Sequence, residues 1–373
     1  MERGRAVRQL NHRYRPARAR SRWTRPSARV LIAALLVVCA TVFSSSTHLT
    51  VPASDPVPSA VPAPPSPVPV PADVTATTSL RAAEPLARTT TMRQTNVAGK
   101  IFRYCANGSI DNPAREAKRV IFVMHGNDRQ PCSVATAALA TGTPEQRAST
   151  LVISPRFPLK EDRVDTQREL FWTFSSWSQG DPSANEDVHV SSYEVLDELI
   201  ERARPIPVVV AGFSGGGQFV NRYAAGTAHN PIRFIIVNPS SYLYFTPDRP
   251  GTPAPQLAIC PAYNHYRYGL EHLNGYMGRV GPETLTRRYG EHRVVYLLGD
   301  ADNDPRSSSM DKTCGALAEG SNRYERGLRY WAYLPQVFGP GIQRHHRLHV
   351  VPRAGHNVHA MFQDPAAKQA LYE

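Results

Sequence analysis

One serine in the sequence stands in a setting that makes a hydroxyl group reactive. Ser214 lies at the centre of Gly212–Gly216 (GFSGG), which follows the apolar run 207–211 and precedes a helix-like segment. Small residues two positions before and after a serine permit a sharp strand-to-helix turn that presents its hydroxyl. The pattern predicts a nucleophile at Ser214. A phosphate-binding loop is the alternative, but no lysine follows the glycines.

A serine hydroxyl is a weak nucleophile, so it needs a neighbouring base to accept its proton. His356 follows the last strand-like run, 348–351, after a short loop. In hydrolases with this kind of serine turn the base comes last in the chain, after the serine and the acid. We therefore predict that His356 is the base, with His349 and His359 as alternatives.

The base in turn needs an acid that orients its ring and stabilises its charged form. Asp300, Asp302 and Asp304 follow the strand-like run 293–298, between the serine and the histidine. We favour Asp302 and keep the other two as alternatives. The same cluster resembles the start of a calcium-binding EF-hand loop, but Pro305 occupies the position that needs glycine. We expect no metal and no cofactor.

A fourth element would stabilise negative charge on a substrate oxygen. The segment 125–127 (HGN) follows the apolar run 119–124. A backbone N–H after such a strand, together with the N–H after the nucleophile, forms an oxyanion hole in enzymes of this kind. The candidates are the N–H groups of Asn127 and Gly215.

The elements that must position these residues follow a regular order. Short apolar runs rich in β-branched residues alternate with helix-like segments such as 192–203 and 322–334, which is typical of an α/β doubly wound domain with a mostly parallel sheet. Two long insertions, 156–190 and 241–290, interrupt the alternation and are expected to act as lids or binding loops. Their aromatic residues either line a substrate site or pack the insertions onto the sheet. The predicted strands are 119–124, 150–154, 207–211, 233–237, 293–298 and 348–351.

Together these elements resemble the α/β-hydrolase superfamily, and in particular exported, esterase-like serine hydrolases. The resemblance covers residues 96–373 and rests on His125-Gly126, the GFSGG motif, Gly299–Asp302 and Gly355-His356. It implies a cofactor-free hydrolase that cleaves an ester, amide or thioester bond of a small or polymeric substrate through an acyl-enzyme. Lyase and perhydrolase members of the fold also use serine and stay open.

The first 95 residues have a different character. Residues 1–29 contain ten Arg and one Glu, and residues 30–50 contain no charged residue. This order predicts a basic cytoplasmic tail and then a signal anchor or signal peptide, followed by an exported domain that is membrane-anchored or, after cleavage, secreted. Residues 51–95 begin with a proline-rich stretch and are predicted to be a flexible linker. We expect no nucleic-acid partner, because a cytoplasmic position next to a membrane segment already accounts for the arginines of residues 1–29.

Four cysteines remain when Cys39, within the apolar block, is set aside. An exported domain folds in an oxidising compartment, so an even number of cysteines favours disulfides over free thiols. We prefer the pairs Cys105–Cys132 and Cys260–Cys314, because each brackets neighbouring parts of the chain.

The competing functional hypothesis is a catalytically silent binding module on a membrane stalk.

Overall fold

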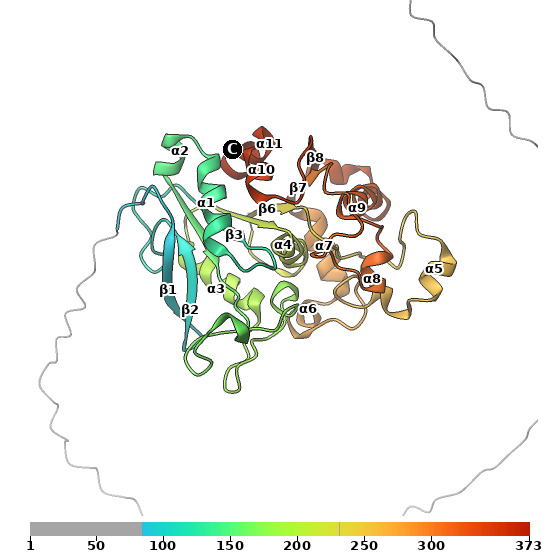
Figure 1. Ribbon diagram of the computed structural model, residues 1–373, viewed down its shortest axis with the longest axis horizontal. Helices are drawn as coiled ribbons and strands as arrows, with labels where there is room; N and C mark the ends of the chain where they lie inside the picture. Colours follow the sequence, from blue (N-terminus) through green and yellow to red (C-terminus); the bar gives the residue numbers. More distant parts are fainter. Residues whose placement is uncertain (1–83, 231) are drawn as a thin grey trace, which may run out of the picture. The chain divides into compact units, whose positions relative to one another are not determined.

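The computed structural model describes residues 84–230 and 232–373, which form a central sheet with helices packed around it (Figure 1). The strand order is β1-β2-β4-β3-β5-β6-β7-β8. Strand β2 runs antiparallel to β1 and β4, and the remaining neighbours run parallel. The strands are β1 Thr91–Val97, β2 Lys100–Ala106, β3 Arg119–Met124, β4 Thr150–Pro155, β5 Val208–Phe213, β6 Ile232–Val237, β7 Arg293–Gly299 and β8 His346–Val351.

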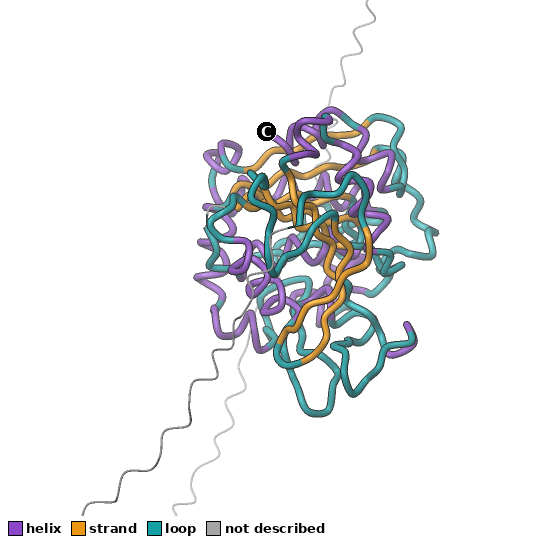
Figure 2. The backbone as a smooth tube through the Cα atoms, turned by 90° about the vertical axis from the view of Figure 1, so that its left-hand side faces the viewer, coloured by secondary structure: helices purple, strands orange, loops and turns teal. Residues whose placement is uncertain are grey.

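The α-helices cover both faces of this sheet, and Figure 2 shows the strands passing through the middle of the domain. They are α1 Pro131–Thr141, α2 Pro144–Ala148, α3 Ser192–Ala203, α4 Gly215–Gly226, α5 Ala254–Ala258, α6 Gly275–Val280, α7 Pro282–Glu291, α8 Cys314–Leu317, α9 Arg323–Phe338, α10 Val358–Gln363 and α11 Pro365–Tyr372. Short 3-10 helices are η1 Lys160–Asp162, η2 Trp177–Gln179, η3 Pro261–Asn264 and η4 Pro340–Arg344.

Alternation along the strands builds two hydrophobic cores. In β3, Val120, Phe122 and Met124 join the larger core, which includes residues of α3, α4, α7 and α9. Ile121 and Val123 join the second core, which includes residues of α1, α10 and α11. Successive side chains of a strand point to opposite faces, so a strand buried on both faces needs the unbroken apolar run seen in the sequence.

The predicted α/β doubly wound, mostly parallel sheet is therefore confirmed. All six predicted strands are present, with ends that differ by two residues or fewer. The helix predicted at 192–203 is α3, and the one predicted at 322–334 is α9, which begins one residue later and continues to Phe338 with Pro335 inside it.

The predicted domain boundary at residue 96 is wrong. Residues 91–95, assigned to the linker, belong to β1, which pairs with β2 along its whole length. Strand β1 (TMRQTNV) is largely exposed and polar, so no apolar run announces it. Backbone pairing with β2, rather than burial of side chains, holds it in the sheet.

The two insertions contribute aromatic residues mainly to packing. Trp172 and Trp177 of the first insertion, and Tyr242 and Tyr244 of the second, are buried in the larger core. Phe174 is the exception, with 59% of its surface exposed. Of the two roles that the sequence leaves open for these aromatics, most of them therefore have the second, which is to pack the insertions onto the sheet.

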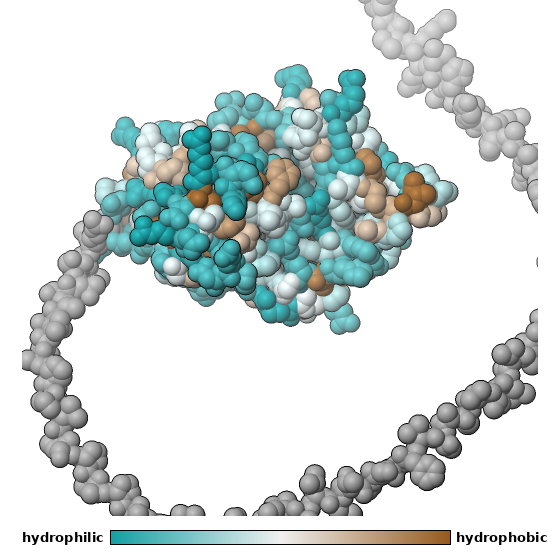
Figure 3. Space-filling view, turned by 60° about the horizontal axis from the view of Figure 1, so that its bottom comes forward, coloured by the Kyte–Doolittle hydropathy of each residue, from teal (hydrophilic) through white to brown (hydrophobic). Residues whose placement is uncertain are grey.

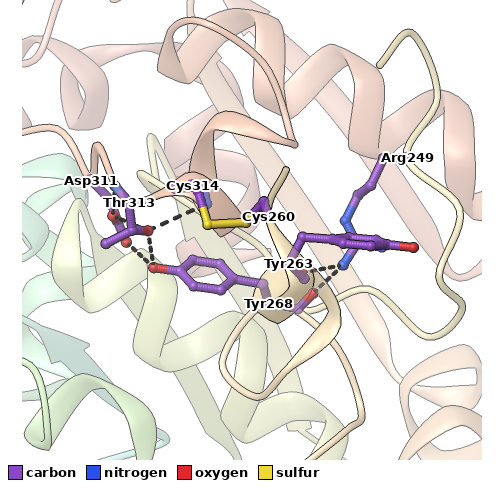
Figure 4. The surroundings of a disulfide bond; sticks show 8 residues. Arg249, Cys260, Tyr263, Tyr268, Asp311, Thr313 and Cys314 are labelled. Atoms are coloured by element: carbon purple, nitrogen blue, oxygen red, sulfur yellow. Dashed lines mark hydrogen bonds between the residues drawn. A yellow bond between two sulfur atoms is a disulfide. The ribbon is translucent and has the colours of Figure 1, made fainter. Parts of the chain in front are cut away.

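Both preferred disulfides are present. Cys105 in β2 is bonded to Cys132 in α1, and Cys260 in the second insertion is bonded to Cys314 in α8. Figure 4 shows Tyr268 beside the second bridge, where its hydroxyl contacts Asp311 at 2.8 Å and Thr313 at 2.5 Å. These contacts tie the second insertion to the loop after β7, which carries the three aspartates.

The predicted basic tail, signal segment and the part of the linker before residue 84 lie outside the described residues. Between residues 84 and 373, apart from 231, no helix is long and apolar enough to cross a membrane. The face drawn in Figure 3 is mainly hydrophilic, with small separate hydrophobic areas. The large hydrophobic side chains exposed in the described part are Met92, Phe174, Ile259, Leu317 and Leu328.

Candidate active site

The predicted nucleophile occupies a strained turn between β5 and α4. Ser214 has φ 58° and ψ −118°, a conformation that few residues with a side chain adopt. Its N–H donates to the carbonyl of Val237 at the end of β6, which fixes the turn to the neighbouring strand. A Cβ on Gly212 would lie 2.1 Å from the carbonyl oxygen of Gly216, so the motif needs glycine where strand and helix meet.

Three side chains form one hydrogen-bonded row at the carboxyl ends of the strands. The Oγ of Ser214 lies 2.9 Å from Nε2 of His356, and Nδ1 of His356 lies 2.6 Å from Oδ2 of Asp302. Nδ1 donates to the carboxylate, so Nε2 of the neutral ring is free to accept the serine proton. Ser214 and Asp302 are buried, whereas His356 is partly exposed. This chain of hydrogen bonds places the base next to the hydroxyl that loses its proton, and the carboxylate next to the base that it orients.

The predicted contact of Asp302 with His356 is confirmed, and the two alternative aspartates point elsewhere. Asp300 accepts the backbone N–H of Arg353 at 2.6 Å, and Asp304 accepts that of Arg306 at 2.9 Å. Asp304 therefore stabilises its own turn, whereas Asp300 connects the loop after β7 to the loop after β8 that leads to His356.

The alternative histidines are also placed away from Ser214. His349 pairs with Asp364 at 3.1 Å, at the start of α11, and His359 is exposed on α10. The ring of Phe213 lies beside the ring of His356, with centroids 4.7 Å apart. This packing helps to keep His356 over the serine.

Sequence reasoning missed a buried cation behind the carboxylate. Arg323, the first residue of α9, donates to Oδ1 of Asp302 at 3.1 Å. Its guanidinium also donates to the hydroxyls of Ser240 and Ser309, at 2.9 and 3.0 Å. The side chains of Arg323 and Asp302 are only 1% and 5% exposed, so solvent screens this pair little. With both oxygens of Asp302 engaged, its carboxylate is fixed in direction.

Asn238, directly after β6, is a second residue that the sequence did not reveal. Its Oδ1 accepts the N–H of Gly299 at 2.8 Å, and its Nδ2 donates to the carbonyl of Gly355 at 3.4 Å. It thereby connects the strand that leads to Asp302 with the loop that carries His356.

The predicted oxyanion residues lie side by side. A Cβ on Gly215 would come within 2.4 Å of the side-chain oxygen of Asn127, and one on Gly126 within 3.4 Å of the Cβ of Ser214. Gly215 is the first residue of α4, where backbone N–H groups have no acceptor within the helix. Arg129 supports the loop, because it donates to the carbonyl of Asn127 and to Asp162 of the first insertion, each at 2.5 Å.

His125 has a structural place in the same loop. It is fully buried, its Nδ1 donates to the carbonyl of Gly126, and its Nε2 accepts the N–H of Phe157. Burial lowers the pKa of His125 to about 4, against the opposing effect of the hydrogen bond to Gly126. The neutral ring therefore connects the loop 125–127 to the first insertion.

We expect His125 to make the protein acid-sensitive. The unfolded chain binds this proton below about pH 6.5 and the folded chain only below about pH 4, so stability falls as the pH falls between these values. The shift corresponds to about 3 kcal/mol of unfolding free energy. Urea unfolding from pH 7 to pH 4 should show a shallower pH slope in His125→Asn than in the wild type. The exposed His359→Asn is the control, and equal slopes in all three proteins would contradict the assignment.

No group of three or more His, Cys, Asp or Glu side chains in the described part of the chain could hold a metal ion. The arrangement around Ser214 is one that can transfer a proton from a hydroxyl to an imidazole.

The comparisons with known proteins agree on the fold. No family model and no curated protein matches the sequence. A poly(3-hydroxybutyrate) depolymerase from Bordetella parapertussis has a similar structure, with a TM-score of 0.53 and 20% identity over 76% of this chain and 93% of its own. The poly(aspartic acid) hydrolase-1 from Sphingomonas sp. KT-1 also has a TM-score of 0.53 and 20% identity, over 77% of this chain and all of its own. The chain therefore shares the fold of these two proteins.

Proposed function

We propose that this chain is a serine hydrolase that cleaves an ester bond through an acyl-enzyme. The observation that carries the proposal is the hydrogen-bonded row from Ser214 through His356 to Asp302, with distances of 2.9 and 2.6 Å. A nucleophile, a base and an orienting acid at these separations are the parts that nucleophilic catalysis at a carbonyl requires.

In the proposed first step, Oγ of Ser214 attacks the ester carbonyl while Nε2 of His356 takes its proton. Asp302 stabilises the resulting imidazolium, and the N–H groups of Asn127 and Gly215 receive the negative oxygen. The imidazolium then protonates the leaving alcohol, which departs and leaves an acyl group on Ser214. Water then attacks this acyl group while His356 takes its proton, the bond to Oγ of Ser214 breaks as His356 returns the proton to Oγ, and the carboxylic acid departs.

The substrate is proposed only as a class. One structural neighbour is named for a polyester and the other for an amide-linked polymer, so a polymeric ester is the first candidate and a polymeric amide the second. Thioesters undergo the same chemistry. The test is turnover by the purified protein of esters of graded acyl length, poly(3-hydroxybutyrate), poly(aspartic acid) and aminoacyl amides. Ester turnover that disappears in the Ser214→Ala variant supports the proposal. Turnover of none of them would favour the silent binding module.

Arg323 is proposed to act through Asp302, as a positioning residue. Arg323→Ala should lower kcat by about 100-fold with KM little changed, because misdirecting a reacting group by about 1 Å costs that much. Added guanidinium, at concentrations that do not unfold the protein, should restore part of the lost kcat by filling the vacated space. Arg306→Ala is the control, because the side chain of Arg306 is 92% exposed on the loop that carries Asp302. A folded Arg323→Ala protein with normal kcat would contradict this role.

We also propose that the domain is exported. The uncharged segment 30–50 anchors it in the membrane or, if this segment is cleaved, the domain is secreted. The two disulfides support export, because such bonds persist in oxidising compartments. A reporter enzyme fused after residue 373 should be active only outside the cytoplasm, and the four domain cysteines should resist thiol reagents until reduced. An active cytoplasmic reporter with four free thiols would refute export.

A further inference from the structure

A basic hollow lies at the opposite edge of the sheet from Ser214. Ser214 follows the carboxyl end of β5, whereas the hollow is lined by residues near the amino ends of β6, β7 and β8 and by residues of α11. It has a volume of about 590 Å³. We call it the basic cleft, after the cationic and imidazole side chains that line it: Arg233, Arg293, Arg344, Arg347, His345 and His349.

Strand register brings three of these arginines to one face. Arg233 of β6 lies directly opposite Arg293 of β7, and Val295, two residues further along β7, lies opposite Arg347 of β8. Residues two apart on a strand share a face, so the three arginines project to the same side. This is the side covered by α11, because Arg233 donates to the carbonyl of Ala370 at 2.9 Å.

In the described part of the protein, the arginines that line the basic cleft outnumber the acidic residues that line it. Within residues 84–373, without 231, the four lining arginines form no ion pair closer than 4.0 Å. Glu373 is the one acidic residue among those that line it. Burial lowers the pKa of Arg233, and the neighbouring Arg119, Arg293 and Arg347 lower it further against the opposing effect of Glu373. Like charges held this close repel one another, and a bound anion would relieve that repulsion.

We propose that the basic cleft is a binding site for a soluble, multiply charged phosphate anion. Guanidinium groups present paired N–H donors whose geometry matches phosphate oxygens, and several of them converge here. Phospholipid headgroups share this chemistry, but the arginines line a hollow between α11 and the strand ends, and a hollow fits a free anion better than a membrane surface. The site is separate from Ser214, so binding does not depend on the proposed hydrolysis.

The test uses the full chain with tripolyphosphate as the probe. Titration calorimetry at constant ionic strength should give saturable binding, and the anion should raise the melting temperature. Arg293→Gln/Arg347→Gln removes two exposed cations of the basic cleft and should weaken binding by about tenfold or more. Arg287→Gln/Arg306→Gln removes the same charge from exposed positions outside the cleft and should bind as the wild type does.

The unliganded variants give a second measurement. Arg347→Gln should unfold at the same or a higher temperature than the wild type without phosphate, because it relieves repulsion, and at a lower temperature with saturating tripolyphosphate. Equal affinity of the two double variants would overturn the proposal, since binding would then follow net charge alone. No binding of tripolyphosphate, or binding only to vesicles of anionic phospholipid, would also overturn it.

Discussion

Replacing Ser214 by alanine is expected to lower kcat for ester hydrolysis by about 10⁴-fold or more, while the melting temperature changes little. The substitution removes the oxygen that lies 2.9 Å from Nε2 of His356. The strained backbone at position 214 is kept, and alanine removes only one atom from a buried position. Substrate binding should survive, because the substituted group acts in bond formation rather than in holding the substrate.

The measurement is steady-state hydrolysis of the best ester found for the wild type, together with thermal unfolding of both proteins. Ser149→Ala, at the end of α2, is a matched control whose turnover should stay normal. Near-normal turnover by Ser214→Ala would remove the serine from the mechanism and with it the proposed acyl-enzyme.

Replacing Asp302 by asparagine should lower kcat by about 10³- to 10⁴-fold. The amide Nδ2 of asparagine can donate to Nδ1 of His356, which favours the tautomer that carries its proton on Nε2. That nitrogen can then no longer accept the proton of Ser214. Because asparagine has nearly the shape of aspartate, the loss would come from the tautomer rather than from a change in fold.

Two neighbouring aspartates provide controls of the same chemistry. Asp300→Asn and Asp304→Asn should keep kcat within a few-fold of the wild type, because Asp300 accepts the backbone N–H of Arg353 and Asp304 that of Arg306, and an asparagine oxygen can accept the same bonds. A larger loss in either control than in Asp302→Asn would reassign the acid.

The sequence revealed the parts of the fold that bury apolar runs. Strands such as β3 (RVIFVM) are apolar on both faces, and the turn at Ser214 is bounded by Gly212 and Gly216, where a Cβ would lie 2.1 and 2.2 Å from a backbone oxygen. Strand β1 could not be predicted in this way, because its side chains are mostly polar and exposed and only its backbone pairing identifies it.

The choice among the three aspartates was an expectation that only coordinates could test. The side chains of nearby residues in one loop point in different directions, and the direction of each depends on partners that can lie far away in the sequence. Arg323 illustrates this, because it contacts Asp302 across 21 residues and a loop of irregular structure. Its place at the start of the predicted helix 322–334 follows from the sequence, but nothing there pairs it with a carboxylate.

The most direct test of the account is covalent labelling with a fluorophosphonate, followed by mass spectrometry of the labelled peptide. The reagent phosphonylates serines that a neighbouring base has activated. We predict one adduct per chain, on Ser214, which is absent from denatured protein, from Ser214→Ala and, at short times, from His356→Gln. Native protein that stays unlabelled, or an adduct on a different serine that persists in Ser214→Ala, would contradict the assignment of Ser214 as an activated nucleophile.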